Sequence, residues 1–260
     1  MNNTFFNWIL RSYSRTRLPA KWLKRKYYKS GAMRFMKRFV KPGGLVFDVG
    51  ANYGWKTELF LAVGARVVAI EPQSECLRVL KRKYGSNLSV FIEPFAAGAA
   101  ETQSHIWKSD VRNQLSSMAP DWIFAVRNSG RFKHFEWSSK EDVNLVTLDS
   151  LVQKHGIPAF CKIDTEGYEF QALQGLSQPL PSLSIEYHVE FLEAAVKSVE
   201  YLARLGDYSF NYTIGEHHGF AGKNRLDSKA VINAIASRKV SSLQGDIYAS
   251  LSLNPFSDFA

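Results

Sequence analysis

The sequence predicts an α/β protein built on a doubly wound, mostly parallel sheet. Short apolar segments typical of buried parallel strands alternate with amphipathic helical segments along most of the chain. The first apolar segment, residues 45–50, ends in a glycine, and the second, residues 66–71, is followed directly by Pro72. Such alternation implies right-handed crossover connections, which place helices on both faces of a single sheet.

Each expected element is delimited by a change of hydrophobic period or by a glycine or proline. In the first half of the chain, we expect strands at 45–50, 66–71 and 88–92, and helices at 57–62 and 74–84. In the second half, the expected strands are 143–147, 160–164 and 183–188, and the expected helices are 149–155 and 190–205. A closing antiparallel pair is expected at 208–214 and 246–251, with a helix at 228–238 between its strands.

Residues 99–142 interrupt this alternation. The segment is polar, has aromatic residues scattered through it, and contains Pro120 and Gly130. We therefore expect a hairpin or a cover over a site, in which Asn113 and Ser116 are candidates to bind a polar substrate. An ordinary surface loop is the alternative.

The composition is that of a globular protein. Of 260 residues, 45% are hydrophobic and 22% are charged, which excludes wholesale disorder and fibrous repeats. Cys76 and Cys161 are too few for a disulfide scaffold or a cysteine-rich metal site, and they fit a reducing compartment such as the cytoplasm. No run of eighteen apolar residues predicts a spanning helix, and the first ten residues do not resemble a secretory signal.

The net charge of +9 is concentrated at the N-terminus. Residues 1–41 contain twelve Lys and Arg and no acid, so residues 42–260 carry 21 basic and 24 acidic side chains, a net charge of −3. We therefore divide the chain into a basic helical extension, 1–41, and a domain, 42–260. Phe5, Trp8 and Ile9 share one helical face, and the extension is interpreted as a solvated cap, as a peripheral contact with an anionic membrane, or as a nucleic-acid contact. Because the domain is near neutral, nucleic-acid binding by the whole domain is not expected.

The first candidate site is the glycine-rich segment from Asp48 to Gly54, between a predicted strand and a predicted helix. Glycines in such a turn allow backbone amides to approach a ligand closely, and Glu71, at the end of the next strand, can accept hydrogen bonds from both hydroxyls of a ribose. The spacing Gly50-x-Asn52-x-Gly54 departs from the dinucleotide pattern, and Asp48 would repel a pyrophosphate. The pattern therefore favours the cationic cofactor S-adenosylmethionine over NAD. A glycine-bearing turn without a ligand is the alternative.

A second group of charged residues lies at the end of the predicted strand 160–164. Lys162, Asp164 and Glu166 alternate on one side of the strand end, and Glu169 begins a helix. Three charges at this position are costly unless they face a cleft, and ligands bind at this edge of an open sheet. The alternative is a helix-starting acid with an ion pair to Lys162.

The following strand ends in Glu186, Tyr187 and His188. Histidine titrates near neutral pH, as a general base for a hydroxyl should, and Glu186 could orient it or bind substrate. A hydrogen-bonded structural histidine is the alternative.

Together these segments resemble the FkbM-type S-adenosylmethionine-dependent methyltransferases. The matching segments follow the family's order over roughly residues 40–251, and they are 46–54, 71–72, 146–151, 162–169 with Leu173 and Gly175, 186–188 and 245–249. The resemblance implies a class I, Rossmann-like methyltransferase fold, with seven strands that are mostly parallel and a closing antiparallel strand. It also implies O-methylation of a hydroxyl on a sugar, a glycolipid or another small molecule such as a polyketide.

The resemblance further implies roles for individual residues. The cofactor-binding residues would be Asp48, Gly50, Asn52, Tyr53 and Gly54 at the methionine end, Glu71 and Pro72 at the ribose, Phe95 and Ala96 at the adenine, and Asp164. Lys162, Asp164, Glu166 and His188 would face the transferred methyl group and the acceptor. His188 is the expected general base, with Asp164 or Glu166 as alternatives. A divalent cation held by the carboxylates is a further alternative that the spacing does not establish.

Two rival functions are compatible with the same sequence. One is an RNA methyltransferase that uses the basic extension, and the other is a non-catalytic membrane- or nucleic-acid-binding module on a Rossmann-like frame. The sequence indicates neither the acceptor nor the oligomeric state.

Overall fold

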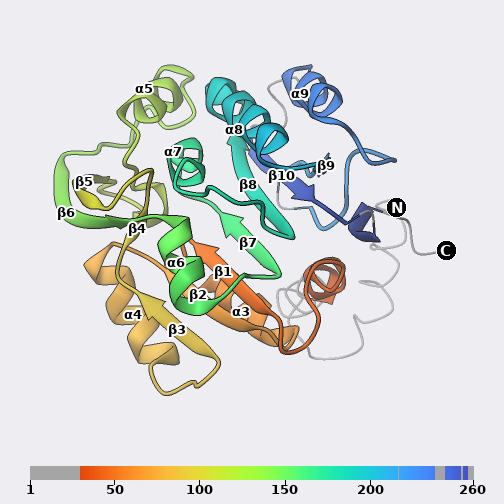
Figure 1. Cartoon of the computed structure of the whole chain (residues 1–260). Coiled ribbons are helices and arrows are strands. Elements are labelled where there is room, and N and C mark those ends of the chain that lie inside the picture. Colours follow the sequence, from red (N-terminus) through yellow and green to blue (C-terminus); the bar gives the residue numbers. More distant parts are fainter. Residues whose placement is uncertain (1–29, 216, 238–243, 253, 257–260) are drawn as a thin grey trace, which may run out of the picture.

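The computed structural model describes residues 30–215, 217–237, 244–252 and 254–256. Within them, a seven-stranded sheet is covered by helices on both faces (Figure 1). The helical face proposed for Phe5, Trp8 and Ile9 lies outside the described residues.

The main sheet has the strand order β3-β2-β1-β7-β8-β10-β9. Its strands are β1 (Leu45–Val49), β2 (Arg66–Ile70), β3 (Val90–Glu93), β7 (Phe160–Ile163), β8 (Ser182–His188), β9 (Ser209–Tyr212) and β10 (Gln244–Ser250). The pairs β1–β2, β1–β7, β2–β3 and β7–β8 are parallel, whereas β10 runs antiparallel to both β8 and β9. The predicted seven-stranded, mostly parallel sheet with a closing antiparallel strand is therefore confirmed. Because the strand order reverses between β1 and β7, a ligand crevice is expected at the carboxyl ends of these two strands.

The helices are divided between the two faces of the sheet according to the alternation of strand side chains. Val46 of β1 faces α3 (Trp55–Ala62) and the helical residues 30–36, and α4 (Ser74–Tyr84) packs on the same side. Phe47, the next residue, faces the opposite layer, which consists of α6 (Leu148–His155), α7 (Glu169–Leu173), α8 (Leu192–Leu205) and α9 (Ser228–Ala236). The short 3₁₀ turns η3 (Val189–Phe191) and η4 (Asn254–Phe256) follow β8 and β10.

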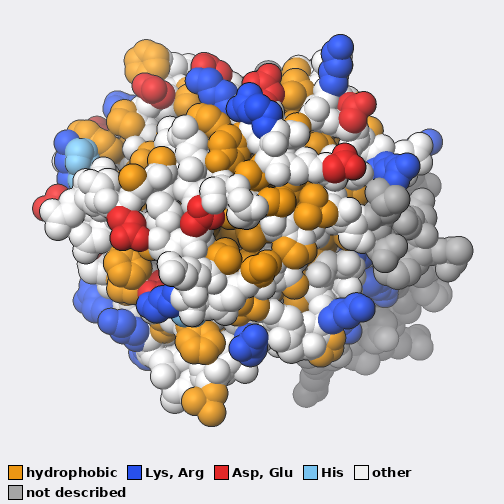
Figure 2. Space-filling view, viewed as in Figure 1, with side chains coloured by type: hydrophobic (Ala, Val, Ile, Leu, Met, Phe, Trp, Pro, Cys, Tyr) orange, Lys and Arg blue, Asp and Glu red, His pale blue; other side chains and the backbone are white. Residues whose placement is uncertain are grey.

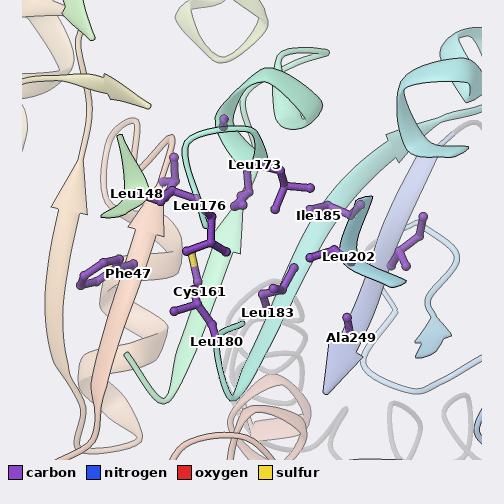
Figure 3. Packing of buried hydrophobic residues seen from close by; sticks show 14 of the residues in the cluster. Phe47, Leu148, Cys161, Leu173, Leu176, Leu180, Leu183, Ile185, Leu202 and Ala249 are labelled. Atoms are coloured by element: carbon purple, nitrogen blue, oxygen red, sulfur yellow. The ribbon is translucent and has the colours of Figure 1, made fainter. Parts of the chain in front are cut away.

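The larger hydrophobic core lies between the sheet and helices α6–α9. In Figure 3, Cys161 of β7 and Ile185 of β8 lie among leucines that include Leu148 of α6, Leu173 of α7 and Leu202 of α8. These five side chains are essentially inaccessible to solvent. Each buried leucine or isoleucine contributes ~2 kcal/mol, so this layer holds the strand ends in register beneath the site.

A second, three-stranded sheet has the order β4-β6-β5 and consists of β4 (Ala96–Ala97), β5 (Thr102–Lys108) and β6 (Ser139–Val146). The prediction that residues 143–147 form a strand of the main sheet was wrong, because β6 pairs with β5 and β4 instead. Val143 and Leu145 are buried against Ile106 of β5, while Asn144 between them is exposed. This one-sided burial is typical of a sheet with one solvated face.

The segment between β5 and β6 folds as a compact insertion, at the upper left of Figure 1. It contains the 3₁₀ turn η2 (Asn113–Leu115) and helix α5 (Pro120–Asn128). Trp122 of α5 is fully buried, and its ring packs edge-on against Trp137 with 6.3 Å between the centroids. The insertion therefore has a small apolar core of its own.

The described part of the basic extension, residues 30–41, packs on the domain. Phe35, Met36, Phe39 and Val40 are buried in a cluster with the sheet residue Tyr248, and the rings of Phe39 and Tyr248 stack 5.3 Å apart. The boundary at residue 41 stays a prediction. No helix in the described ranges is both long enough and apolar enough to cross a membrane.

Candidate active site

A cavity of about 940 Å³ lies at the carboxyl ends of β1, β2, β7 and β8. The predicted site residues that line it are Gly50, Asn52, Glu71, Pro72, Phe95, Ala96, Ser116, Lys162, Asp164, Glu166 and Glu186. Five other predicted residues do not line it, and these are Asp48, Tyr53, Gly54, Asn113 and His188. The volume is at the upper end of ordinary ligand sites and has room for a nucleoside cofactor and a small acceptor.

The glycine-rich turn is held by the main chain of β2. The amides of Gly50 and Ala51 both donate to the carbonyl oxygen of Ile70, each at 3.0 Å. Gly50 has φ 79°, and a Cβ atom there would overlap the carbonyl oxygen of Asp164. Glycine is therefore required at this position, where the turn lies directly against the end of β7.

Glu71 lies beneath this turn and is 2% exposed. Its Oε2 accepts from the amide of Asn52 and its Oε1 accepts from the amide of Gln73, each at 2.8 Å. Burial raises the pKa of Glu71 to about 7. A carboxylate oxygen can accept more than one hydrogen bond. Each oxygen of Glu71 can therefore also accept a hydrogen bond from a ligand hydroxyl.

Asp48 lies behind the turn rather than on the cavity wall. Its Oδ2 accepts from the hydroxyl of Thr57 at 2.6 Å, and it is the register partner of Lys162 on β7. Burial raises the pKa of Asp48, although the Lys162 ammonium opposes this shift. The side chain thus acts on Lys162 rather than on a ligand directly.

Tyr53 and Asn113 form a hydrogen-bonded network at the start of α4. The Tyr53 hydroxyl donates to Glu75 at 3.1 Å and accepts from the Asn113 amide at 2.8 Å, while the same amide nitrogen donates to Glu75 at 2.7 Å. The network ties the glycine-rich turn to the insertion. Gly54 packs close to Tyr84, because a Cβ atom would lie 2.7 Å from its ring.

Gln73 is a cavity residue that the sequence reasoning missed. It is buried, its Nε2 donates to the carbonyl oxygen of Asn113 at 3.2 Å, and its Oε1 has no hydrogen-bond partner within the described part of the chain. A buried acceptor of this kind needs a donor, and an exocyclic amino group of a base would supply one. The sequence feature that could have indicated Gln73 is its position two residues after Glu71, the acid at the end of a strand.

Lys162 and Asp164 form an ion pair at the floor of the cavity, with 2.6 Å between Nζ and Oδ2. Burial alone would lower the pKa of Lys162, but Asp164 and Asp48 outweigh it and the pKa is raised. Burial alone would raise the pKa of Asp164, but Lys162 outweighs it and lowers the pKa to about 2. Asp164 therefore stays ionised and is a weak proton acceptor.

Glu166 occupies the left-handed region, with φ 53°. This conformation costs ~1 kcal/mol in a residue with a long side chain, and such strain gathers at functional sites. The turn is fixed by the Ser117 hydroxyl, which donates to the Glu166 carbonyl at 2.6 Å, and by Glu169, whose Oε1 accepts from the amides of Thr165 and Gly167 at 2.8 and 3.1 Å. Glu166 lines the cavity, and burial raises the pKa of its carboxyl.

His188 lies behind the carboxylates, 3% exposed, with its ring edge-on to Trp122 at 5.3 Å. Its Nε2 is 3.1 Å from Glu186 Oε2 and 3.5 Å from Glu166 Oε2. Burial alone would lower the pKa of His188, but the two carboxylates outweigh it and raise the pKa well above its ordinary value. His188 is therefore held between the two carboxylates and does not line the cavity. Its role as the general base stays a prediction.

Glu166, Glu186 and His188 also offer ligand atoms within 4.8 Å of one another, a spacing that a metal ion could use. A metal-bound histidine normally donates its other ring nitrogen to an oxygen. Here the Arg131 guanidinium lies 3.5 Å from Nδ1, so a donor occupies the place of the acceptor. The donor set fits a proton-sharing cluster better than a metal centre.

Aromatic residues that the sequence reasoning did not select also line the cavity. Trp55, which is 62% exposed, lines the cavity with Phe132 and Tyr168, and Arg131 and Gln244 are hydrogen-bonded to each other beside them. Gln244 Nε2 donates to Glu186 Oε1 at 3.2 Å. All five lie in loops or at element ends, where periodicity gives no indication of which side chains face a cavity.

The doubly wound sheet, the glycine-rich turn and the acid at the end of β2 define a class I methyltransferase fold. The sequence of residues 48–228, more than half of the chain, matches the methyltransferase FkbM domain family. The chain belongs to this family of S-adenosylmethionine-dependent methyltransferases. A search of curated proteins finds no significant match.

Solved structures similar to this chain include three bacterial methyltransferases. The precorrin-6Y C5,15-methyltransferase of Geobacter metallireducens is 10% identical with a TM-score of 0.45, over 86% of this chain and 87% of that one. An O-methyltransferase of Bacillus cereus in complex with SAH is 14% identical with a TM-score of 0.41, over 97% and 92%. An rRNA methylase of Streptococcus thermophilus is 9% identical with a TM-score of 0.42, over 84% and 93%.

Proposed function

We propose that this protein transfers the methyl group of S-adenosylmethionine to a hydroxyl of a small-molecule or glycan acceptor, with Glu166 as the general base. The observation that carries the proposal is the Glu166 carboxyl, held at the cavity wall in a strained turn with its oxygen 3.5 Å from buried His188.

The cofactor half of the cavity fits a nucleoside. Glu71 would accept hydrogen bonds from the ribose hydroxyls, and Gln73 Oε1 would accept one from the amino group of adenine between Pro72 and Phe95. Gly50 leaves the main chain open to close approach by the methionine end. When bound, S-adenosylmethionine supplies an electrophilic methyl group on a positively charged sulfur.

The opposite half of the cavity has the groups needed to take up a proton. Glu166 has a raised pKa, which brings a carboxyl closer to the operating pH and makes it a more effective base than Asp164, whose pKa is about 2. His188 lies between Glu166 and Glu186 and holds both carboxyls in place. His188 is therefore a positioning residue, and Lys162 holds Asp164 ionised.

The acceptor class follows from the character of the wall. Trp55, Phe132 and Tyr168 offer flat apolar surfaces, and Ser116 and Arg131 offer hydrogen-bond donors beside them. A sugar ring or a hydroxylated polyketide has the matching combination of an apolar face and polar edges. The two buried free thiols support the cytoplasm as the place of action, since thiols stay reduced there.

An acceptor screen on the purified protein tests this function, with production of S-adenosylhomocysteine as the readout. Sugars, glycolipids and hydroxylated polyketides are offered in turn to the wild type, Glu166→Gln and Glu193→Gln, a matched control on the exposed surface of α8. We expect Glu166→Gln to lower kcat by about 10²–10⁴-fold with little change in cofactor affinity, and the control to behave as wild type. Full activity of Glu166→Gln on an accepted substrate would exclude Glu166 as the base.

A further inference from the structure

The helical residues 30–36 and the turn that follows them have one apolar and one basic side. Phe35, Met36 and Phe39 are buried against the sheet, and the Phe35 and Tyr248 rings meet edge-on at 5.2 Å. The exposed residues on the other side include Arg34, Lys37 and Lys41. No acidic residue occurs before Asp48, so acids from the same segment do not neutralise these charges.

The first turn of this helix forms part of the cavity wall. Ala32 lines the cavity together with Trp55, Lys56 and His218, and a Cβ atom at Gly31 would lie 3.5 Å from the His218 ring. The chain leads on from this helix to β1, which begins at Leu45. The first turn of this helix therefore lies beside the cavity.

The preceding chain has the composition of a membrane-surface segment. Residues 1–29 contain eight Lys and Arg and no acid, together with Phe5, Phe6, Trp8, Trp22, Tyr27 and Tyr28. Basic residues are attracted to anionic headgroups, and Trp and Tyr favour the interface between headgroups and acyl chains.

The body of the domain shows a different distribution of charge. Residues 42–260 carry a net charge of −3, and basic and acidic side chains are intermingled over the face in Figure 2. The cavity wall has four Lys and Arg against five acids, which are Glu58, Glu71, Asp164, Glu166 and Glu186. A nucleic-acid strand would need a basic track leading to the reacting carboxyl, and this wall does not favour one.

We propose that residues 1–41 bind an anionic membrane surface and hold the part of the cavity wall with Ala32 and the exposed Trp55 toward the headgroups, so that the acceptor is a lipid-linked hydroxyl compound. This inference rests on the proposed methyl transfer and narrows its acceptor to the glycolipid class. Attachment is electrostatic and peripheral, and the acceptor head group enters the cavity while its acyl chains stay in the bilayer.

Vesicle binding by the full-length protein tests the attachment. Arg34, Lys37 and Lys41 are changed together to Gln, and the matched control changes Arg78, Lys81 and Arg82, which are exposed on α4. We expect the wild type and the control to sediment with vesicles of equal phosphatidylglycerol and phosphatidylcholine, and not with phosphatidylcholine alone. The test variant should bind about a hundredfold more weakly, because each basic residue contributes about fivefold.

Several results would overturn the proposal. One is that the wild type fails to bind the anionic vesicles or binds single-stranded RNA more tightly than the vesicles. Another is that the two triple variants lose vesicle affinity to the same extent. Calorimetric titration with S-adenosylhomocysteine separates this inference from the proposed function. Intact cofactor affinity without vesicle binding refutes only the membrane proposal, whereas a wild type that does not bind S-adenosylhomocysteine refutes the methyl transfer.

A brominated phosphatidylglycerol tests the orientation of the cavity. The difference in quenched fluorescence between wild type and Trp55→Phe isolates the contribution of Trp55, whose ring is largely exposed beside the cavity. We expect Trp55 to be quenched on vesicle binding. Undiminished Trp55 emission from bound protein would refute the orientation.

Discussion

Glu71 provides the sharpest test of the cofactor site, because its pKa of about 7 makes ligand binding depend on pH. A ribose hydroxyl donates to the ionised carboxylate, so binding S-adenosylhomocysteine favours loss of the Glu71 proton. The direction follows from this linkage. Affinity should be low where Glu71 is protonated and should rise as pH passes through about 7.

The size of the effect follows from the same pKa. With a pKa of about 7, roughly a tenth of Glu71 is ionised at pH 6 and roughly nine tenths at pH 8, so affinity should rise about tenfold over this interval. At pH 7, binding should release about half a proton. In Glu71→Gln, one hydrogen bond to a charged acceptor is lost, which corresponds to ~1.5–3 kcal/mol or about a ten- to hundredfold loss of affinity.

Isothermal titration calorimetry in buffers of different ionisation enthalpy measures both the affinity and the proton release. Glu169→Gln is the matched control, because burial raises the pKa of Glu169 to about 7 as well but its side chain does not line the cavity. The control should keep the pH dependence, and Glu71→Gln should lose it. A wild-type affinity that is flat from pH 6 to pH 8, or an unchanged slope in Glu71→Gln, would refute the ribose assignment.

Three further predictions concern stability and reactivity. Gly50→Ala should unfold the domain or lower its melting temperature severely, because the added Cβ atom would overlap a main-chain oxygen. Gly43 has a similar φ of 81° but open space around it, so Gly43→Ala should lower the free energy of unfolding by only ~1 kcal/mol, as measured by thermal denaturation. Cys76 and Cys161 are fully buried with raised thiol pKa values, so neither should react with a thiol reagent until the protein is unfolded by urea, and rapid labelling of the native protein would contradict their placement. Leu173→Ala should lower the free energy of unfolding by ~2–5 kcal/mol through the cavity it leaves, and a loss below ~1 kcal/mol would show that the layer beneath the site collapses to fill it.

The main sheet was predictable because its signal is local. β1, β2 and β7 are short apolar segments with a breaker or a charged residue at their ends, and the structure places all three where the hydrophobic pattern does. The error at residues 143–147 has the same origin. A strand buried on one face and a strand buried on both look alike over five residues, so the pattern does not reveal which sheet a strand joins.

The candidate site was predictable only in part. Glu71 and Glu166 follow strands directly, and strand ends meet at one edge of a parallel sheet, so their convergence could be expected. His188 has equally suggestive chemistry and position, but whether a side chain at a strand end faces the cavity depends on its neighbours. Here Trp122, from the insertion, packs edge-on against the ring, and His188 does not line the cavity.

The turn that carries Glu166 is fastened to the insertion as well as to the sheet. Ser117 holds its carbonyl oxygen, and Gly167 lies so close to Trp122 that no side chain would fit between them. The wall that meets the acceptor and the carboxyl that would take its proton therefore move as one piece. A change of sequence in the insertion that re-shapes the wall for another acceptor would also shift the reacting oxygen, so acceptor preference and turnover cannot be altered independently in this protein.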